Sequence, residues 1–208
     1  MVLLLVLLLV LLLVLLLVLL LTLDRQFNHV HSPNFAALDY CNSSVRGPVG
    51  DSTQELDNSI GKIMAGVKKM GLDESTVFFF TSDNGAPLSN DQYGNGPLRD
   101  GKTTTWEGGI REPACVRWKG TIRPGISGAL TATYDIFPTV LSMAGASAPF
   151  VKSRSKSAVT IDGIDLTPLL MGKGKGHDCL IHYHSPQAGG DTASANSSGV
   201  AAVRCGRY

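Results

Sequence analysis

The chain has 208 residues, with 18 basic and 17 acidic side chains and a net charge of +1. This even balance, without a basic stripe, gives no electrostatic support for nucleic-acid binding, and we exclude that class of partner. The four cysteines, Cys41, Cys115, Cys179 and Cys205, include no CxxC pair, which argues against a zinc site and a thioredoxin-like motif.

Residues 1–23 form one apolar run of leucine and valine, broken only by Thr22. About 20 apolar residues suffice to cross a bilayer as a helix. A cleavable signal peptide fits poorly, because no basic residue precedes the run and no small-residue cleavage site follows it. The perfect four-residue repeat is also typical of a mistaken gene start. Two interpretations therefore stay open, a transmembrane helix that tethers the protein and an artefact of the gene model.

The next segment, residues 24–50, is rich in polar residues and predicts an extended, loop-rich stretch. It contains His29 and His31. Alternate side chains on an extended backbone point the same way, so the two imidazoles are expected to share one site. A histidine can donate a proton or bind an oxyanion near neutral pH.

A helix is expected next. Ser52 and Glu55 have the spacing of a capping box, and Gly71 suits the C-terminal end. The apolar stripe at helical spacing consists of Leu56, Ile60, Ile63, Met64 and Val67. The lysines of this helix lie mostly off that stripe and indicate a solvated face.

The run from Thr76 to Thr81 is short, apolar and rich in β-forming residues, which predicts a strand buried on both faces of a parallel sheet. It ends in Ser82-Asp83-Asn84-Gly85. Ligands of open α/β sheets bind beyond the carboxyl ends of the strands. Asp83 and Asn84 offer two hard oxygen ligands suited to Ca²⁺ or Mg²⁺, although the same residues are common in ordinary turns.

Residues 86–112 are rich in glycine and asparagine and too long for a simple connector, which favours a functional loop. Lys102 lies among its glycines. A lysine is a compact point charge suited to a tetrahedral oxyanion, but the spacing of a phosphate-binding P-loop is missing. Arg111 and Glu112 at the end of this loop are interpreted as a structural ion pair.

The rest of the chain predicts short elements. Asp135 is a candidate N-cap for an amphipathic helix, residues 147–157 are a polar linker, and 166–171 a short helical piece. Residues 200–204 suggest a strand with no later segment to pair with. Sequons begin at Asn42 and Asn196 and weakly favour the secretory pathway.

Taken together, the motifs resemble the sulfatase family, specifically the arylsulfatase type. The string FFTSDNG followed by GKTTTWEGGIREP resembles the sulfatase signature, and GPVGDSTQELDNSIGKIM resembles the helix that precedes it. YDIFPTVLSMAG and DGIDLTPLL match the next two landmarks in the right order. The resemblance covers roughly residues 29–208.

The resemblance implies a site and a reaction. Asp83 and Asn84 would ligate a divalent cation, usually Ca²⁺, while Lys102 would contact the sulfate group and His31 would bind sulfate or assist the leaving group. The substrate would be a sulfated small molecule or glycan. Fixed cations and donors would stabilise the negative charge that develops on the leaving oxygen.

The sequence also departs from the family. Its nucleophile is a formylglycine made from a Cys-x-Pro-x-Arg type of motif, and none of the four cysteines has that context. Two further aspartates of the cation site are absent as well. We therefore predict that this chain alone is inactive.

The expected fold is part of an alkaline-phosphatase-like α/β sheet sandwiched by helices, with its N-terminal portion missing and an apolar helix in front. The expected divisions are 1–23 for the apolar tract, 24–150 for the C-terminal part of the catalytic domain, and 151–208 for a linker and a shortened C-terminal subdomain. An exposed sheet edge and apolar face predict poor solubility.

Two other functions stay open beside the sulfatase. One is a membrane-tethered, non-catalytic sulfatase-like protein. The other is a phosphate or phosphonate ester hydrolase of the same superfamily. By family, the location would be the secretory pathway, lysosomal or extracellular, with a membrane contact through residues 1–23.

Overall fold

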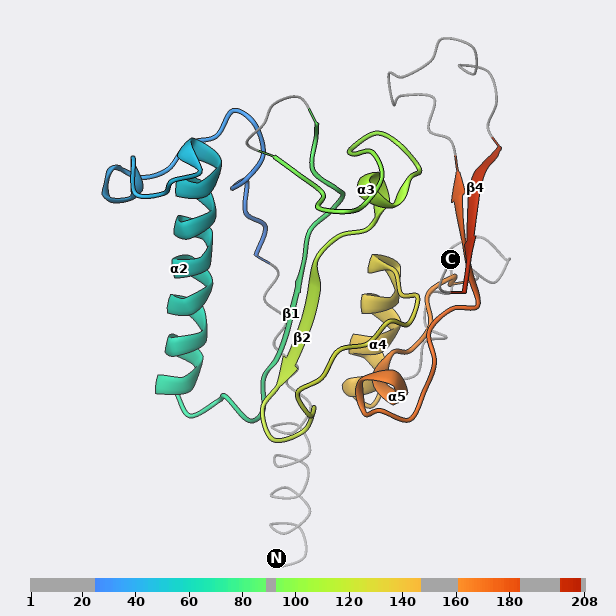
Figure 1. Ribbon diagram of the computed structural model, residues 1–208. Coiled ribbons are helices and arrows are strands. Elements are labelled where there is room, and N and C mark those ends of the chain that lie inside the picture. The colour runs from blue at the N-terminus through green and yellow to red at the C-terminus, as the bar shows by residue number, and fades with distance from the viewer. Residues whose placement is uncertain (1–24, 89–92, 147–160, 184–198, 207–208) are drawn as a thin grey trace, which may run out of the picture.

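The computed structural model describes residues 25–88, 93–146, 161–183 and 199–206. Its helices are α2 (Gly47–Lys69), α3 (Glu107–Ile110), α4 (Ile136–Met143) and α5 (Thr167–Leu170), with 3-10 turns η1 (Leu38–Tyr40) and η2 (Thr133–Asp135). Its strands are β1 (Val77–Thr81), β2 (Ala114–Trp118), β3 (Cys179–Tyr183) and β4 (Val200–Cys205). In Figure 1, α2 lies on one side of β1 and β2, and α4 and α5 on the other.

Some predictions concern residues outside these ranges. The apolar tract 1–23, the linker 147–157 and the sequon asparagine Asn196 are among them. Within the described ranges, no helix has the length and apolar character that a membrane crossing requires.

Helix α2 begins earlier than the capping-box pattern predicted. Pro48 occupies its first turn, where a fixed φ and a missing N–H are tolerated. The capping-box prediction is wrong, because Ser52 is buried inside the helix and its hydroxyl donates to the Val49 carbonyl at 3.1 Å. Glu55 instead accepts a hydrogen bond from the Ala37 amide at 2.8 Å. The C-terminal prediction is confirmed, since Gly71 follows the C-cap residue with a φ of 73°.

Strand β1 forms where it was predicted, but its pairing differs. It pairs antiparallel with β2, with Val77 opposite Trp118 and Thr81 opposite Ala114. The expectation of a parallel strand buried on both faces is wrong for the described part of the chain, where most of β1 is half-buried and Phe80 is exposed. The long loop between the two strands reverses the chain direction, so β2 returns alongside β1.

Asp135 is the centre of the packing around α4. The structure places it at the N-cap as predicted, but its side chain makes no capping hydrogen bond to that helix. The fully buried carboxylate instead accepts from the amides of Ala132 and Ile164, at 2.7 and 2.9 Å, and contacts His177 Nε2 at 2.8 Å. One side chain thus connects η2, the segment before α5 and the segment before β3. The short helical piece predicted at 166–171 is confirmed as α5.

The strand predicted at residues 200–204 is present as β4. It pairs antiparallel with β3, which precedes it in the chain. A disulfide joins Cys179 and Cys205, which face each other in the register of this pair. Cys41 and Cys115 are free and exposed.

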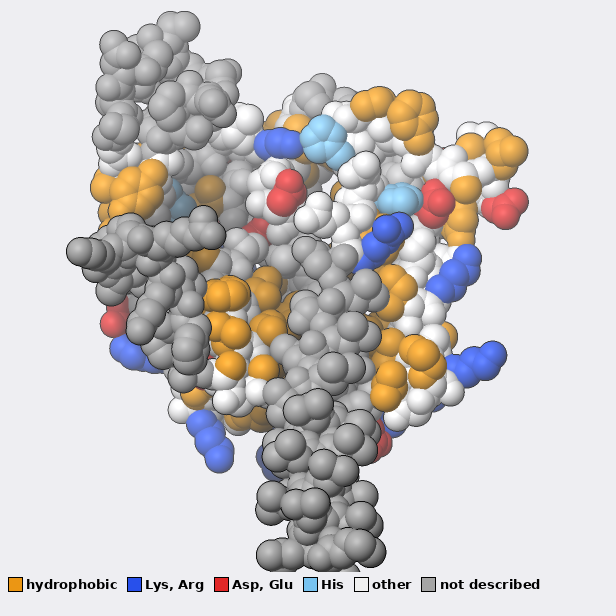
Figure 2. Space-filling model, turned by 180° about the vertical axis from the view of Figure 1, so that it is seen from behind, with side chains coloured by type: hydrophobic (Ala, Val, Ile, Leu, Met, Phe, Trp, Pro, Cys, Tyr) orange, Lys and Arg blue, Asp and Glu red, His pale blue; other side chains and the backbone are white. Residues whose placement is uncertain are grey.

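Large apolar side chains are widely exposed. In the described residues, Leu166 and Leu180 are buried apolar side chains, together with Pro138 of α4. Phe137 and Leu88 are 51% and 58% exposed, and Figure 2 shows hydrophobic patches over one face of the molecule. Exposed patches of this kind favour association with other molecules.

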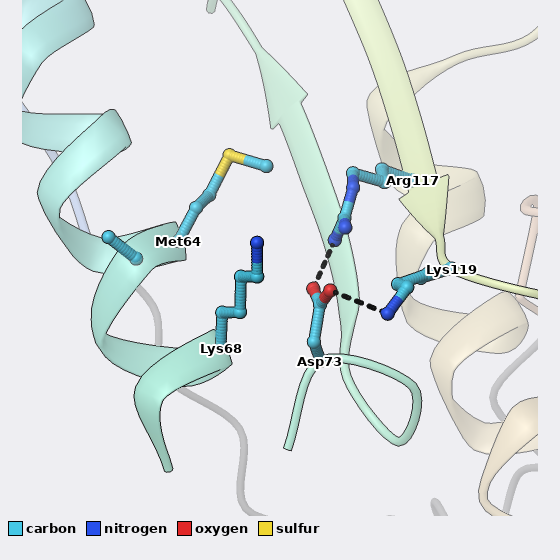
Figure 3. Close-up of a pocket in the computed structure, with 6 residues that line it drawn as sticks. Met64, Lys68, Asp73, Arg117 and Lys119 are labelled. Atoms are coloured by element: carbon cyan, nitrogen blue, oxygen red, sulfur yellow. Dashed lines mark hydrogen bonds and ion pairs between the residues drawn. The ribbon is translucent and has the colours of Figure 1, made fainter. Parts of the chain in front are cut away.

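A cluster of charged side chains lies at the N-terminal end of β1, just before the strand begins. Asp73 is buried and pairs with Arg117 at 2.7 Å and Lys119 at 3.5 Å. A cavity of about 280 Å³ opens beside it, lined by Met64, Ala65, Lys68, Asp73, Arg117 and Lys119 (Figure 3). The motif residues Asp83 and Asn84 follow the opposite end of β1, so this cavity is separate from them.

The Asp73 cluster gives a pH-dependent stability. The hydrogen bond from Arg117 holds the pKa of Asp73 below its ordinary value of 3.8. A lowered pKa means that the ionised carboxylate stabilises the folded chain above about pH 3.8, and that this contribution is lost as the pH falls through the lowered folded pKa. We expect Asp73→Asn to lower the urea midpoint of unfolding at neutral pH. Below about pH 3.8, the midpoint of the variant should fall less steeply with pH than that of the parent. If the urea midpoint of the variant falls with pH as steeply as that of the parent, Asp73 contributes nothing to the loss of stability in acid.

Candidate active site

The loop after β1 and the loop that carries Lys102 are joined through their backbones. The Gly85 amide donates to the Gly109 carbonyl at 3.0 Å, and the Lys102 amide donates to the Ala86 carbonyl at 3.0 Å. The two segments lie 16 or more residues apart in the sequence. They meet at the end of the molecule where β1 finishes and α3 begins (Figure 1).

Glycines allow this close approach. A Cβ at Gly85 would lie 1.8 Å from the Gly108 carbonyl oxygen, and a Cβ at Gly101 would lie 2.5 Å from the Ala86 carbonyl oxygen. Real Cβ atoms do not come that near to backbone oxygens, so any side chain there would push the two loops apart. Glycine is therefore required at these positions of the two motifs, because the two backbones are in direct contact there.

Asn95 strengthens the same junction from within the long loop. Its side-chain oxygen accepts from the Ala86 amide at 2.8 Å, and its side-chain nitrogen donates to the Asp100 carbonyl at 2.9 Å. Sequence reasoning missed this residue. The only available signal was the asparagine content of the loop, which does not single out one position.

His31 and Lys102 lie together. His31 Nε2 is 3.2 Å from Lys102 Nζ, although the two residues are 71 positions apart. His31 Nδ1 lies 2.7 Å from the Ser32 carbonyl oxygen. A carbonyl can only accept, so Nδ1 is the donor in that contact. An ammonium can only donate, so Nε2 accepts from Lys102.

The two histidines do not share one site, and that expectation is wrong. His29 Nε2 lies 3.5 Å from Glu55 on α2, whereas His31 contacts Lys102. Val30 between them has a φ of 65°, so the backbone turns there and alternate residues no longer point the same way. The segment is also held on the long loop, because the hydroxyl of Tyr93 donates to the side chain of Asn34.

Asp83 and Asn84 directly follow β1, with Asp83 exposed and Asn84 half-buried. Glu112 lies across from Asp83, and its buried Oε2 has no hydrogen-bond partner in the described chain. Burial, with a smaller contribution from the charge of Asp83, raises the pKa of Glu112. The expected Arg111–Glu112 ion pair is wrong, since Arg111 pairs at 3.6 Å with Glu107, one helical turn earlier.

Glu107 ties the Lys102 loop to the C-terminal hairpin. Its carboxylate accepts a hydrogen bond from Arg204 Nε of β4 at 2.5 Å and also pairs with Arg111. Sequence reasoning missed this contact, because 97 residues separate the two partners and nothing in the sequence indicates their proximity. The hairpin therefore supports the first turn of α3, which begins five residues after Lys102.

The donor set at the strand end fits a hard cation in kind. Asp83, Asn84 and Glu112 present oxygen atoms, and one carboxylate oxygen is buried without a partner, which suits Ca²⁺ or Mg²⁺. These residues offer fewer oxygen ligands than Ca²⁺ takes, which is six to eight. Over the described ranges, no group of three or more histidine, cysteine, aspartate or glutamate side chains is placed to hold a metal.

This fold and these motifs belong to a known family. The sulfatase family model matches residues 26–146, which is more than half of the chain, and the chain therefore belongs to the sulfatase family. It is 40% identical over 183 residues to arylsulfatase A from Bos taurus, covering 87% of this chain and 33% of that protein. It is 42% identical over 159 residues to N-acetylgalactosamine-6-sulfatase from Mus musculus, covering 74% and 29%. The chain thus spans about a third of the length of these relatives.

Solved structures agree with this assignment. The PsFucS1 sulfatase from Pseudoalteromonas sp. superposes with a TM-score of 0.64 at 34% identity, covering 73% of this chain and 30% of that one. A Bacteroides thetaiotaomicron protein described with the metabolism of glycosaminoglycans gives 0.65 at 26% identity, covering 74% and 33%. The sulfatase fold is therefore supported, and the described part of this chain is a partial α/β version of it.

Proposed function

We propose that this chain carries the sulfate-binding half of a sulfatase active site, and that the protein acts in the hydrolysis of sulfate esters. The observation that carries the proposal is the contact of Lys102 Nζ with His31 Nε2 at 3.2 Å, at the end of the sheet where Asp83 and Asn84 also lie. The names of the relatives, arylsulfatase A and N-acetylgalactosamine-6-sulfatase, support an aryl or sugar sulfate as the class of substrate.

The chemistry of this pair suits a sulfate ester. Lys102 contributes a positive charge with N–H groups beyond the one that binds His31, and these can donate to sulfate oxygens. Cleavage of the S–O bond places negative charge on the leaving oxygen, and a nearby cationic donor stabilises that charge. Since the Nε2 lone pair of His31 accepts from Lys102, the imidazole orients the ammonium when no substrate is bound.

Asp83 and Asn84 would hold the divalent cation, usually Ca²⁺ in this family. Such a cation supplies charge neutralisation to the sulfate group when it is bound. The aspartate contributes an anionic oxygen and the asparagine a neutral carbonyl oxygen, both of which are hard ligands. The backbone bonds of Gly85 and Ala86 fix the turn in which these two residues lie.

The nucleophile of the family is not encoded in these residues. None of Cys41, Cys115, Cys179 and Cys205 is followed by the Pro-x-Arg pattern from which formylglycine is made. We therefore expect the purified 208-residue chain to release no nitrophenol from a nitrophenyl sulfate ester. Turnover above a no-protein blank would contradict the inactivity of the chain, and would leave the sulfate-binding proposal in place.

Sulfate binding by the chain tests the function directly. We expect Lys102→Ala to weaken the binding of a nitrophenyl sulfate, measured by calorimetric titration, by about tenfold or more, because a charge-assisted hydrogen bond is lost. Lys62→Ala on the exposed face of α2 is the matched control and should bind as the parent does. Equal affinities for the parent and the Lys102 variant would contradict the proposed site.

The same titration separates the two remaining functions. A phosphate or phosphonate ester hydrolase of the same superfamily would bind a nitrophenyl phosphate more tightly than the matching sulfate. A non-catalytic sulfatase-like protein would bind sulfated sugars and would show no turnover even when co-expressed with the segments of a sulfatase that this chain does not match. The named relatives favour the sulfate ester.

We also propose that the protein enters the secretory pathway, lysosomal or extracellular. The Cys179–Cys205 disulfide supports this, because such bonds persist in oxidising compartments. Asn42, the first residue of a sequon, is exposed and accessible to modification. A mass shift of the secreted protein after glycosidase treatment, smaller in Asn42→Gln than in the parent, is the expected result.

A further inference from the structure

Arg99 and Trp106, one on each side of Lys102 in the chain, stack on each other. The guanidinium carbon of Arg99 lies 3.5 Å from the centroid of the Trp106 ring. Tryptophan is the aromatic residue that attracts a cation most strongly, and a guanidinium also stacks well on its face. The contact therefore holds a long side chain in place, although both residues are exposed, Trp106 by 47%.

The backbone of Arg99 is fixed as well. Its carbonyl accepts from the Gly108 amide at 2.7 Å, and the following carbonyl accepts from Asn95 Nδ2 at 2.9 Å. Gly108 is also the residue that packs against Gly85, directly after the motif at the end of β1. Arg99 and Lys102 are three positions apart, so their Cα atoms lie within about 11 Å of each other. Arg99 is therefore a rigidly held cation close to the lysine proposed to bind sulfate.

The N–H groups of Arg99 have no acidic partner in the described part of the chain. Arg111, Arg117 and Arg204 each pair there with a carboxylate, whereas Arg99 contacts the Trp106 ring. At 3.5 Å from the centroid, the guanidinium meets the ring with its face. Its donors lie in its own plane, in a fork that matches two oxygens of one anion. Arg99 is thus a preorganised anion-binding group whose donors the described residues do not use.

We infer that Arg99, positioned by Trp106, binds a second sulfate group of the substrate and so selects sugars that carry more than one sulfate. This rests on the proposed function, which assigns the sulfate to be cleaved to Lys102. A guanidinium suits the second sulfate, because its planar fork binds a tetrahedral oxyanion by two parallel charge-assisted hydrogen bonds. Trp106 contributes indirectly, since a side chain that is already held loses less rotamer freedom on binding.

Two galactose sulfates test this inference by calorimetric titration of the purified full chain. We expect the parent to bind galactose 2,6-disulfate about tenfold more tightly than galactose 6-sulfate, because the second sulfate adds charge-assisted hydrogen bonds. Arg99→Ala should abolish this preference and leave the affinity for galactose 6-sulfate unchanged. Arg99→Lys keeps the charge without the planar fork and should retain part of the preference, and Trp106→Leu should reduce it. Arg123→Ala, at an exposed arginine beyond the C-terminal end of β2, is the matched control and should bind both sugars as the parent does.

The possible outcomes separate the role of Arg99 from the proposed function. If Arg99→Ala weakens the binding of both sugars equally, Arg99 acts through the fold of the loop, and its selection of a second sulfate is overturned. Equal affinities of the parent for the two sugars would overturn it as well, while loss of both sugars by Lys102→Ala would uphold the proposed sulfate site. If the parent binds neither sugar, the role of Arg99 and the proposed site are both overturned.

Discussion

Replacement of Gly85 by alanine is expected to destabilise the chain by about 3 kcal/mol, the largest effect we predict for a single methyl group. The added Cβ would lie 1.8 Å from the Gly108 carbonyl oxygen and 2.7 Å from its carbonyl carbon. Both are backbone atoms, which cannot move away as a flexible side chain can. The loop after β1 would have to separate from the Lys102 loop and lose the bond between the Gly85 amide and the Gly109 carbonyl.

Gly85→Ala should also affect the candidate active site. Separation of the two loops moves Asp83 and Asn84 away from Lys102, so sulfate affinity should fall together with stability. Gly61→Ala is the matched control. Gly61 lies within α2 with no atom within 4 Å of its added Cβ, and alanine there should stabilise the helix by about 0.5–1 kcal/mol. Urea unfolding of both variants checks the prediction, and a Gly85 variant as stable as the parent would contradict the close approach.

The second large effect is expected from the Cys179–Cys205 disulfide. Replacement of both cysteines by serine should cost about 3 kcal/mol, since the bond closes a loop with a sequence separation of 26. Leu180 of β3 is buried, but the other large apolar side chains of the hairpin are exposed by half or more, namely Ile181, Tyr183, Val200 and Val203. The hairpin is therefore expected to open locally, before the rest of the chain unfolds.

Opening of the hairpin would also release Glu107. Arg204 leaves with β4, and the carboxylate at the start of α3 keeps only the longer contact with Arg111. Hydrogen exchange should therefore increase in β3, β4 and the first turn of α3 of the serine variant. Cys115→Ser, at an exposed free cysteine, should leave exchange unchanged. Protection of β4 equal to that of the parent would show that strand pairing alone holds the hairpin.

Local elements followed from the sequence where local physical chemistry decides them. The apolar stripe of α2, the β-forming run of β1 and the helix-terminating Gly71 all appear in the structure. The family also followed from the sequence, because FFTSDNG and GKTTTWEGGIREP are long ordered strings and not single residues. The ends of elements were less predictable, as the early start of α2 at Pro48 shows.

The sequence could not provide the pairing of β1. A continuous apolar run fits a parallel strand and a half-buried antiparallel one equally well, since both need β-forming residues. The antiparallel partner, β2, follows a long loop whose path no local rule predicts. The opposition of Asp83 and Glu112 was hidden for the same reason, since it depends on register. The separation of His29 from His31 depends on the positive φ of Val30, which β-branched residues rarely adopt.

By itself, therefore, the sequence determined the sulfatase family, the positions of the main elements and the identity of His31, Asp83, Asn84 and Lys102 as candidates. Those conclusions rest on residue types and spacing, which do not depend on how the chain folds. Only the tertiary structure decided which candidates meet. The contact of His31 with Lys102, the support of α3 by Arg204 and the position of Glu112 join residues up to 97 positions apart. Such contacts are set by strand register and by the close approach of glycine backbones, because both are properties of the packed chain.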